Sequence, residues 1–99
     1  MVQLKWLKSA KKDLKEIYDY ISTDSKRYAK FTVEKIYLKT NILKTNIEIG
    51  KTVEEMKTET IRELAEGNYR IIYKIISAQE IHILMVHHGA RDLQRRIKL

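Results

Sequence analysis

Four basic residues near the ends of two apolar segments have side chains that could bind phosphate or transfer a proton. They are Arg70, His87, His88 and Arg91. Arginine makes bidentate contacts with phosphate, and histidine, with a pKa of about 6.5, exchanges a proton at neutral pH. Arg70 begins one segment and Arg91 follows the next, so antiparallel pairing would bring them close together. Since neighbours on a strand point to opposite faces, only one histidine can join Arg70.

The surroundings of Arg70 leave a second interpretation open. Glu63 and Glu66 precede it across a turn, so Arg70 could instead pair with one of these carboxylates in a hairpin. Arg62 and Glu63 should also make charge contacts with the neighbouring strand. The sequence therefore predicts either a phosphate-binding arginine or a structural ion pair at this position.

The C-terminal segment 87–99 is the most basic part of the chain. It carries four Lys and Arg residues against one Asp, a net charge of four minus one, or +3, without the histidines. Such a segment contacts an anionic target, or it is a solubilising tail. In the first case the residues that bind the target would be Arg70, Arg91, Arg95 and Arg96.

The composition narrows the class of partner. Twenty Lys and Arg against thirteen Asp and Glu give a net charge of +7, which favours polyanionic partners such as nucleic acid or an acidic protein. There is no cysteine, and the three histidines have no metal-binding spacing, so we expect no metal and no cofactor. No apolar run approaches the ~20 residues of a membrane span, and no signal-peptide core is present. We therefore expect a cytoplasmic protein without a membrane partner or a small-molecule substrate.

The elements that would position these residues follow from hydrophobic periodicity. In the first half of the chain, period-two and period-3.6 patterns predict a strand at 2–7, a helix from Ser9 to Ile21 and a longer helix from about 26 toward Gly50. In the second half, they predict a loop at 51–59 and strands at 60–64, 68–76 and 80–88, with a possible short helix at 90–97. Two helices joined by a short turn lie antiparallel. The prediction is one α+β domain over residues 1–99, β-α-α-β-β-β, with an antiparallel sheet packed against an αα-hairpin.

Local details of the helices and the core also follow from these patterns. Ser9 is a plausible N-cap of the first helix, and Asp13 falls on its charged face, which we expect to be solvated. Four aromatic residues sit on periodic apolar faces and are expected to belong to the core: Trp6, Tyr18, Tyr69 and Tyr73.

Three blocks of the chain are similar to motifs of a known superfamily. Residues 10–21 read AKKDLKEIYDYI, residues 61–73 read IRELAEGNYRIIY, and residues 83–93 read ILMVHHGARDL. The first matches a helix of the form A-x-x-D-L-x-x-I-x-x-Y-I, the second a block R-E-L-x-x-G-x-Y-R-I-x-Y, and the third a final strand with H-x-x-R-x-L. With the order of elements, they make the chain resemble the RelE/ParE toxins of type II toxin–antitoxin systems.

The resemblance implies a cognate antitoxin protein as partner and two alternative targets. ParE-like members bind and inhibit DNA gyrase, whereas RelE-like members cut mRNA on the ribosome without a metal. In the nuclease case the catalytic residues would be Arg70, His87, His88 and Arg91. The lysines and the tyrosine of the RelE pattern, however, fall on Ile61, Glu63 and Ile97, which cannot perform that chemistry. The resemblance therefore favours the gyrase target.

A function of another class stays open at the level of the sequence. A small basic α+β domain could be a non-toxic RNA-binding module that recognises shape and phosphate. The double-stranded RNA-binding fold, however, places its strands between its two helices, whereas here both long helices precede the meander. An inactive relic of a toxin is a further alternative.

Overall fold

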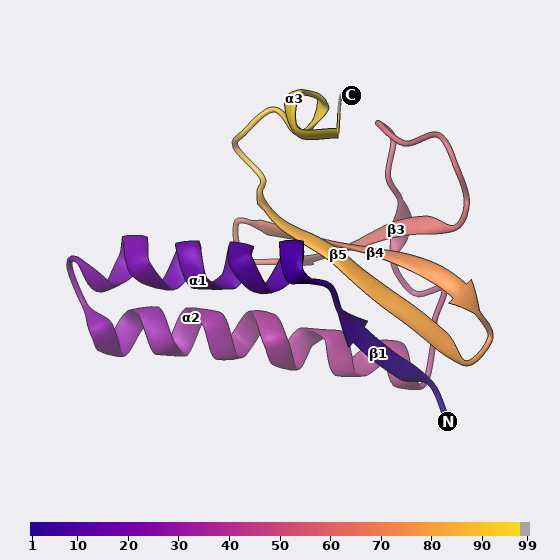
Figure 1. Cartoon of the computed structure of the whole chain (residues 1–99), viewed down its shortest axis with the longest axis horizontal. Helices are drawn as coiled ribbons and strands as arrows, with labels where there is room; N and C mark the ends of the chain where they lie inside the picture. Colours follow the sequence, from indigo (N-terminus) through magenta and orange to yellow (C-terminus); the bar gives the residue numbers. More distant parts are fainter. Residues whose placement is uncertain (98–99) are drawn as a thin grey trace.

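The computed structural model describes residues 1–97 and contains a helical hairpin followed by a β-meander (Figure 1). The elements are β1 (Gln3–Trp6), α1 (Lys8–Ser22), α2 (Lys26–Lys39), the 3-10 helix η1 (Thr40–Lys44), β2 (Lys51–Thr52), β3 (Ile61–Glu66), β4 (Tyr69–Ser77), β5 (Glu80–His88) and α3 (Leu93–Ile97). The predicted α+β class, the helical hairpin and the short C-terminal helix are confirmed.

The sheet has five strands in the order β1-β5-β4-β3-β2. The meander β3-β4-β5 is antiparallel, as the sequence predicts, and Gly67, with φ of 59°, supplies the positive φ of its first two-residue turn. β1 lies parallel to β5, so the complete sheet is mixed. Part of the expected loop 51–59 is the two-residue strand β2, which pairs with β3.

The helical hairpin covers one face of the sheet, here called the helix face, and its far end extends past the strands in Figure 1. Between the two layers lies the main core, whose fully buried members include Ala10, Ile36, Leu43, Ile71, Tyr73, Ile81 and Ile83. Of the predicted core aromatics, Tyr73 is completely buried, Trp6 and Tyr69 pack against the core, and Tyr18 is half-buried. The apolar periodicity of the chain therefore located this layer correctly.

The other face of the sheet, here called the open face, has only a small cover. Val53 from the loop after β2 and Leu93 from α3 are buried there against Ile72 of β4. Met56 from the same loop and Met85 from β5 pack around them. The C-terminal helix thus packs back on the domain, and it does so on the face opposite the helical hairpin.

Two predicted helix ends are wrong. α1 begins at Lys8 with Leu7 as its cap residue, and the hydroxyl of Ser9 instead donates to the carbonyl oxygen of Leu84, at 2.5 Å. α2 ends at Lys39 rather than near Gly50, since the backbone tightens into η1. The apolar spacing continues through η1, which explains why periodicity alone extends the helix. Within residues 1–97 no helix is long and apolar enough to cross a membrane.

Candidate functional site

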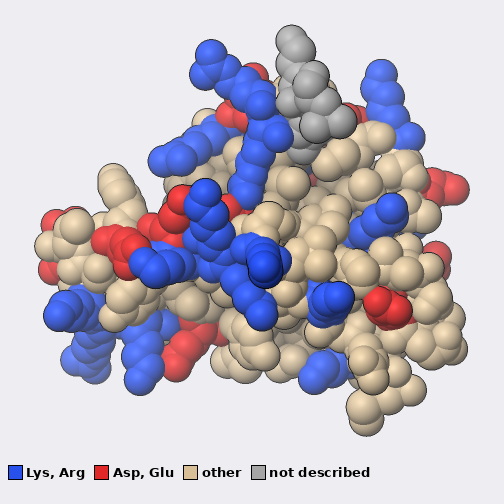
Figure 2. All heavy atoms as spheres, in the orientation of Figure 1, with Lys and Arg blue, Asp and Glu red and all other residues tan. Residues whose placement is uncertain are grey.

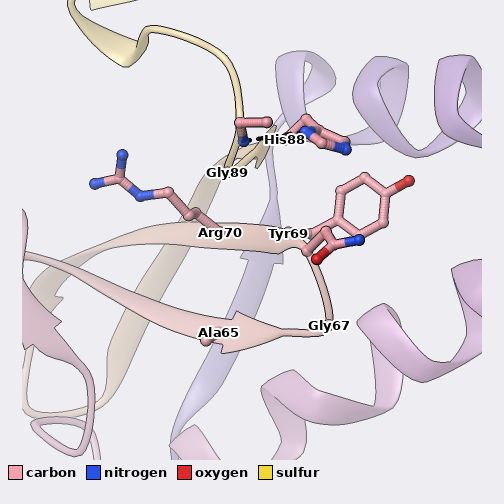
Figure 3. A pocket seen from close by; sticks show the side chains of 8 residues that line it. Ala65, Gly67, Tyr69, Arg70, His88 and Gly89 are labelled. Atoms are coloured by element: carbon pink, nitrogen blue, oxygen red, sulfur yellow. Dashed lines mark hydrogen bonds between the residues drawn. The ribbon is translucent and has the colours of Figure 1, made fainter.

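The register of β4 and β5 separates the predicted site residues onto two faces. Arg70 is the cross-strand partner of His87, and Tyr69 is the partner of His88. The rings of Tyr69 and His88 meet edge to face with centroids 5.4 Å apart, and Figure 3 shows the Arg70 side chain pointing away from both of them. The two histidines do face opposite ways. His87 shares the open face with Arg70, and His88 lies on the helix face.

Arg70 is held by two carboxylates. Its guanidinium donates to both oxygens of Glu63, at 2.8 and 2.6 Å, and to both oxygens of Glu55, at 3.1 and 3.0 Å. These bonds raise the pKa of Arg70, and the hydrogen bond from Arg70 lowers the pKa of Glu55. The predicted pairing with Glu63 is confirmed, whereas Glu66 contacts Lys35, at 3.5 Å. We call Arg70, Glu55 and Glu63 the arginine fork.

The arginine fork lines a hollow of about 470 Å³ on the open face. Its lining residues are Lys51, Glu54, Glu55, Glu63, Ala65 and Arg70. Three carboxylates against two cations leave a net charge of two minus three, or −1. A phosphate entering this hollow would meet more negative than positive charge and would have to displace a carboxylate from Arg70.

Glu55 was missed at the level of the sequence. It lies in a segment without a clear period, 15 positions before Arg70, and nothing in that spacing indicates contact. The adjacent acidic residues Glu54 and Glu55 were the one signal available, because a carboxylate that becomes partly buried needs a cationic or hydrogen-bonding partner. Only the path of the loop over the open face shows which of the two reaches the arginine.

A second ion pair ties the C-terminal helix to the first helix. Arg96 of α3 bonds to the carboxylate of Asp13 on α1 and donates to the carbonyl oxygen of Val86, at 3.3 Å. Asp13 also accepts the backbone N–H of Val86, at 2.8 Å, and is only 8% exposed. The expectation that Asp13 lies on a solvated face is therefore wrong. Its position on α1 faces β5, where the carboxylate accepts the backbone N–H of Val86.

His87 lies buried between these two ion-pair groups. One ring nitrogen is 3.0 Å from the carbonyl oxygen of Arg91, and the other contacts the guanidinium of Arg96, at 3.5 Å. The residue as a whole is 5% exposed. His87 therefore helps to hold the turn that leads into α3, and in this conformation it has little contact with solvent.

A further hollow, of about 430 Å³, lies at the hairpin end of the sheet (Figure 3). It is lined by Ala65, Gly67, Asn68, Tyr69, Arg70, His88, Gly89 and Ala90. Burial raises the pKa of the Tyr69 hydroxyl, and the charge of Arg91 acts in the opposite direction. Of the two histidines only His87 shares a face with Arg70, which agrees with the expectation that at most one of them can join it.

The remaining predicted target-binding residues are at the surface. Arg91 and Arg95 are exposed, whereas the side chain of Arg96 is 31% exposed and ion-paired. Lys and Arg side chains lie along α1 and near α3 in Figure 2, and Asp and Glu side chains are interspersed among them. Among residues 1–97, no three histidine or carboxylate side chains come together as metal ligands do.

The fold is that of a small α+β protein with a mixed five-stranded sheet, and comparison with known proteins gives its family. The family described as "ParE toxin of type II toxin-antitoxin system, parDE" matches residues 4–93. The chain therefore belongs to the ParE toxin family, within the RelE/ParE superfamily.

Two solved structures share the fold. One is described as the chromosomal ParDE TA system from P. aeruginosa, with 24% identity, a TM-score of 0.73, and coverage of 89% of this chain and 96% of that chain. The other is the toxin–antitoxin complex RelBE2 from Mycobacterium tuberculosis, with 19% identity, a TM-score of 0.58, and coverage of 88% and 96%. No curated protein matches the sequence.

Proposed function

We propose that this ParE-family toxin acts in the cytoplasm by binding and inhibiting DNA gyrase, and that it does not cut mRNA. The observation that supports this proposal is the arginine fork. In the RelE pattern the family arginine works with lysines, but here Arg70 is saturated by Glu55 and Glu63 in a hollow of net negative charge. Metal-independent cleavage needs cations around the scissile phosphate, so this hollow is unsuited to it.

The exposed arginines of the C-terminal segment are the proposed target contacts. Arg91 and Arg95 are free to face a large partner, whereas Arg70 and Arg96 would first have to leave their carboxylates. We expect Arg91→Ala to weaken toxicity while the thermal midpoint stays within about 2 °C of the parent, because a surface change of this kind costs little stability. Toxicity equal to the parent in Arg91→Ala and Arg95→Ala would remove this surface from the proposal.

The decisive test compares two activities of one preparation. Purified full-length protein is added to a gyrase supercoiling assay and to ribosomes translating a defined mRNA. We expect supercoiling to be inhibited while the mRNA stays intact. Cleaved mRNA with normal supercoiling would overturn the proposal, and unchanged growth after high expression of the chain alone would indicate an inactive relic.

We also propose that a cognate antitoxin binds the outer face of α2 and η1. The two similar structures are described as toxin–antitoxin assemblies. Exposed apolar side chains recur there at helical spacing: Tyr28, Phe31, Leu38 and Ile42. Residues 26–44 carry six Lys and Arg against one Glu, a net charge of six minus one, or +5. An acidic amphipathic segment would complement both the apolar stripe and this charge.

The antitoxin surface can be tested by co-purification. Phe31 and Leu38 are 54% and 60% exposed, so replacing both by Ala removes apolar contact without opening the core. We expect this double variant to lose at least tenfold in antitoxin affinity. Ile76→Ala, which changes an exposed apolar residue of β4, is the control and should bind as the parent does. Equal affinity in both variants would place the antitoxin elsewhere.

A further inference from the structure

Three basic side chains stand side by side across three strands of the sheet. Lys5 of β1 is the register partner of His82 on β5, and His82 is the partner of Lys74 on β4. Neighbouring strands lie about 4.8 Å apart, so the two lysines are separated by about 10 Å at the backbone. We call Lys5, His82 and Lys74 the cationic row.

The cationic row points to the open face. On each of the three strands, the residues on either side of the row pack into the main core on the helix face: Leu4 and Trp6, Ile81 and Ile83, and Tyr73 and Ile75. Since successive side chains of a strand point to opposite faces, the row must face the other way. Lys5 and Lys74 are exposed, so neither the loop after β2 nor α3 covers them.

The charges of the two lysines are not compensated within the described chain. Nε2 of His82 lies 2.6 Å from the carboxylate of Glu80, so this carboxylate is already engaged. Among residues 1–97, neither the Lys5 nor the Lys74 ammonium has a carboxylate within 4.0 Å. The two lysines lie on β1 and β4, on either side of His82 of β5, so the described chain leaves both positive charges without a carboxylate partner on this face.

Protection of a sheet edge explains only part of the row. Lys5 lies on the edge strand β1, where a lysine prevents pairing with other chains. Lys74 lies on β4, which is paired on both sides, so it has no edge to protect. An exposed lysine at this position, opposite a histidine on a central strand, is better explained by a ligand that carries negative charge.

We propose that the cationic row binds the phosphate backbone of duplex DNA. Lysine ammonium groups on long, flexible stems suit contacts with phosphates that do not depend on sequence. Single-stranded nucleic acid is recognised largely by stacking on aromatic rings, and the aromatic residues of the described strands, Trp6, Tyr69 and Tyr73, belong to the helix face. The row therefore fits the backbone of a duplex. This activity is separate from the proposed inhibition of gyrase and does not depend on it.

The test measures how salt affects DNA binding. Full-length protein and the double variant Lys5→Gln/Lys74→Gln are titrated onto a fluorescent duplex at several salt concentrations, with folding checked by circular dichroism. Each phosphate contact contributes about 0.9 to the slope of log K against log salt, so we expect the double variant to lose about 1.8. The control variant Lys26→Gln/Lys30→Gln removes the same charge from exposed positions on α2, and its slope should fall by less than half of that amount.

Three outcomes would overturn the proposal. One is an equal loss of slope in both double variants, which would mean that net charge and not the row attracts DNA. Another is the absence of DNA binding by the parent at about 50 mM salt, where electrostatic binding is strong. The third is that polyglutamate, at equal charge, competes with the duplex for the parent protein, and that its binding is weakened to the same degree in the Lys5→Gln/Lys74→Gln variant. That result would indicate an acidic protein as the partner. Because the assay contains no gyrase, its failure leaves the gyrase proposal standing.

Discussion

The open face of the sheet carries two groups of charged side chains that differ in whether their charges are paired within the chain. In the arginine fork, one guanidinium meets two carboxylates and makes four hydrogen bonds with them. In the cationic row, two exposed lysines flank a histidine that is bonded to the carboxylate of Glu80. The three charges of the fork are paired with one another, so removal of any one of them leaves a partly buried charge without its partner. The two lysines of the row have no carboxylate within 4.0 Å among the described residues, and an anionic ligand would supply that negative charge.

The largest expected difference between the two groups concerns removal of the cation. Arg70→Ala leaves Glu63, which is 7% exposed, without its partner, and we expect it to lower the free energy of unfolding by about 3 kcal/mol. Lys74→Ala should change it by less than about 0.5 kcal/mol, because its ammonium is exposed. Urea titration followed by circular dichroism measures both. A cost for Arg70→Ala below that of Lys74→Ala would reverse the comparison.

Within the fork, the two carboxylates should not contribute equally. The side chain of Glu63 is 7% exposed and that of Glu55 is 23% exposed, so water screens the second pair more strongly. We expect Glu63→Gln to cost about 2 kcal/mol and Glu55→Gln less than about 1 kcal/mol in the same titration. Equal costs would show that Arg70 depends on both carboxylates as one unit.

The fork should also make stability depend on pH in a definite direction. Hydrogen bonding to Arg70 lowers the pKa of Glu55 below its ordinary value of 4.5, so the folded chain holds this proton less tightly than the unfolded chain. The contact therefore adds stability above pH 4.5 and loses it as the pH falls through the lower folded value. We expect the urea midpoint of the parent to fall more below pH 4.5 than that of Glu55→Gln. If the urea midpoints of the parent and of Glu55→Gln fell by the same amount with pH, Glu55 would not be the group responsible.

The smallest expected effect is a gain in stability. Lys74→Gln removes a positive charge that lies two strands away from that of Lys5, and we expect it to raise the free energy of unfolding by less than about 0.5 kcal/mol. Lys30→Gln on the exposed face of α2 is the control and should leave the thermal midpoint unchanged. A loss of stability in Lys74→Gln would mean that the lysine has a structural partner within the chain.

Much of the fold could be predicted from local patterns. The bounds of β5 were predicted as observed, and α1 differs from its prediction by one residue at each end. Both elements have a strong period that spans their whole length, and short-range pattern is enough to define it. The end of α2 was predicted less well, because η1 continues the same apolar spacing with a different backbone.

The candidate site was predicted only in part, for a physical reason. The pairing of Arg70 with Glu63 follows from a hairpin, in which residues close in sequence face each other. Glu55 reaches the same guanidinium from a loop, and loop paths depend on packing rather than on period. Asp13 and Val86 lie 73 positions apart, and only the docking of α1 on β5 shows that this carboxylate is buried.

The sequence by itself determined the class of the fold, the helical hairpin, the meander, and the opposite orientation of His87 and His88, because these depend on periods of 2 and 3.6 that neighbouring residues carry. The tertiary structure alone decided that β1 joins β5 in parallel. That pairing places Lys5 beside His82, and a shift of one residue would turn Lys5 toward the core. Register between distant segments is set by the packing of the whole sheet against the helices, so no local pattern could reveal the cationic row.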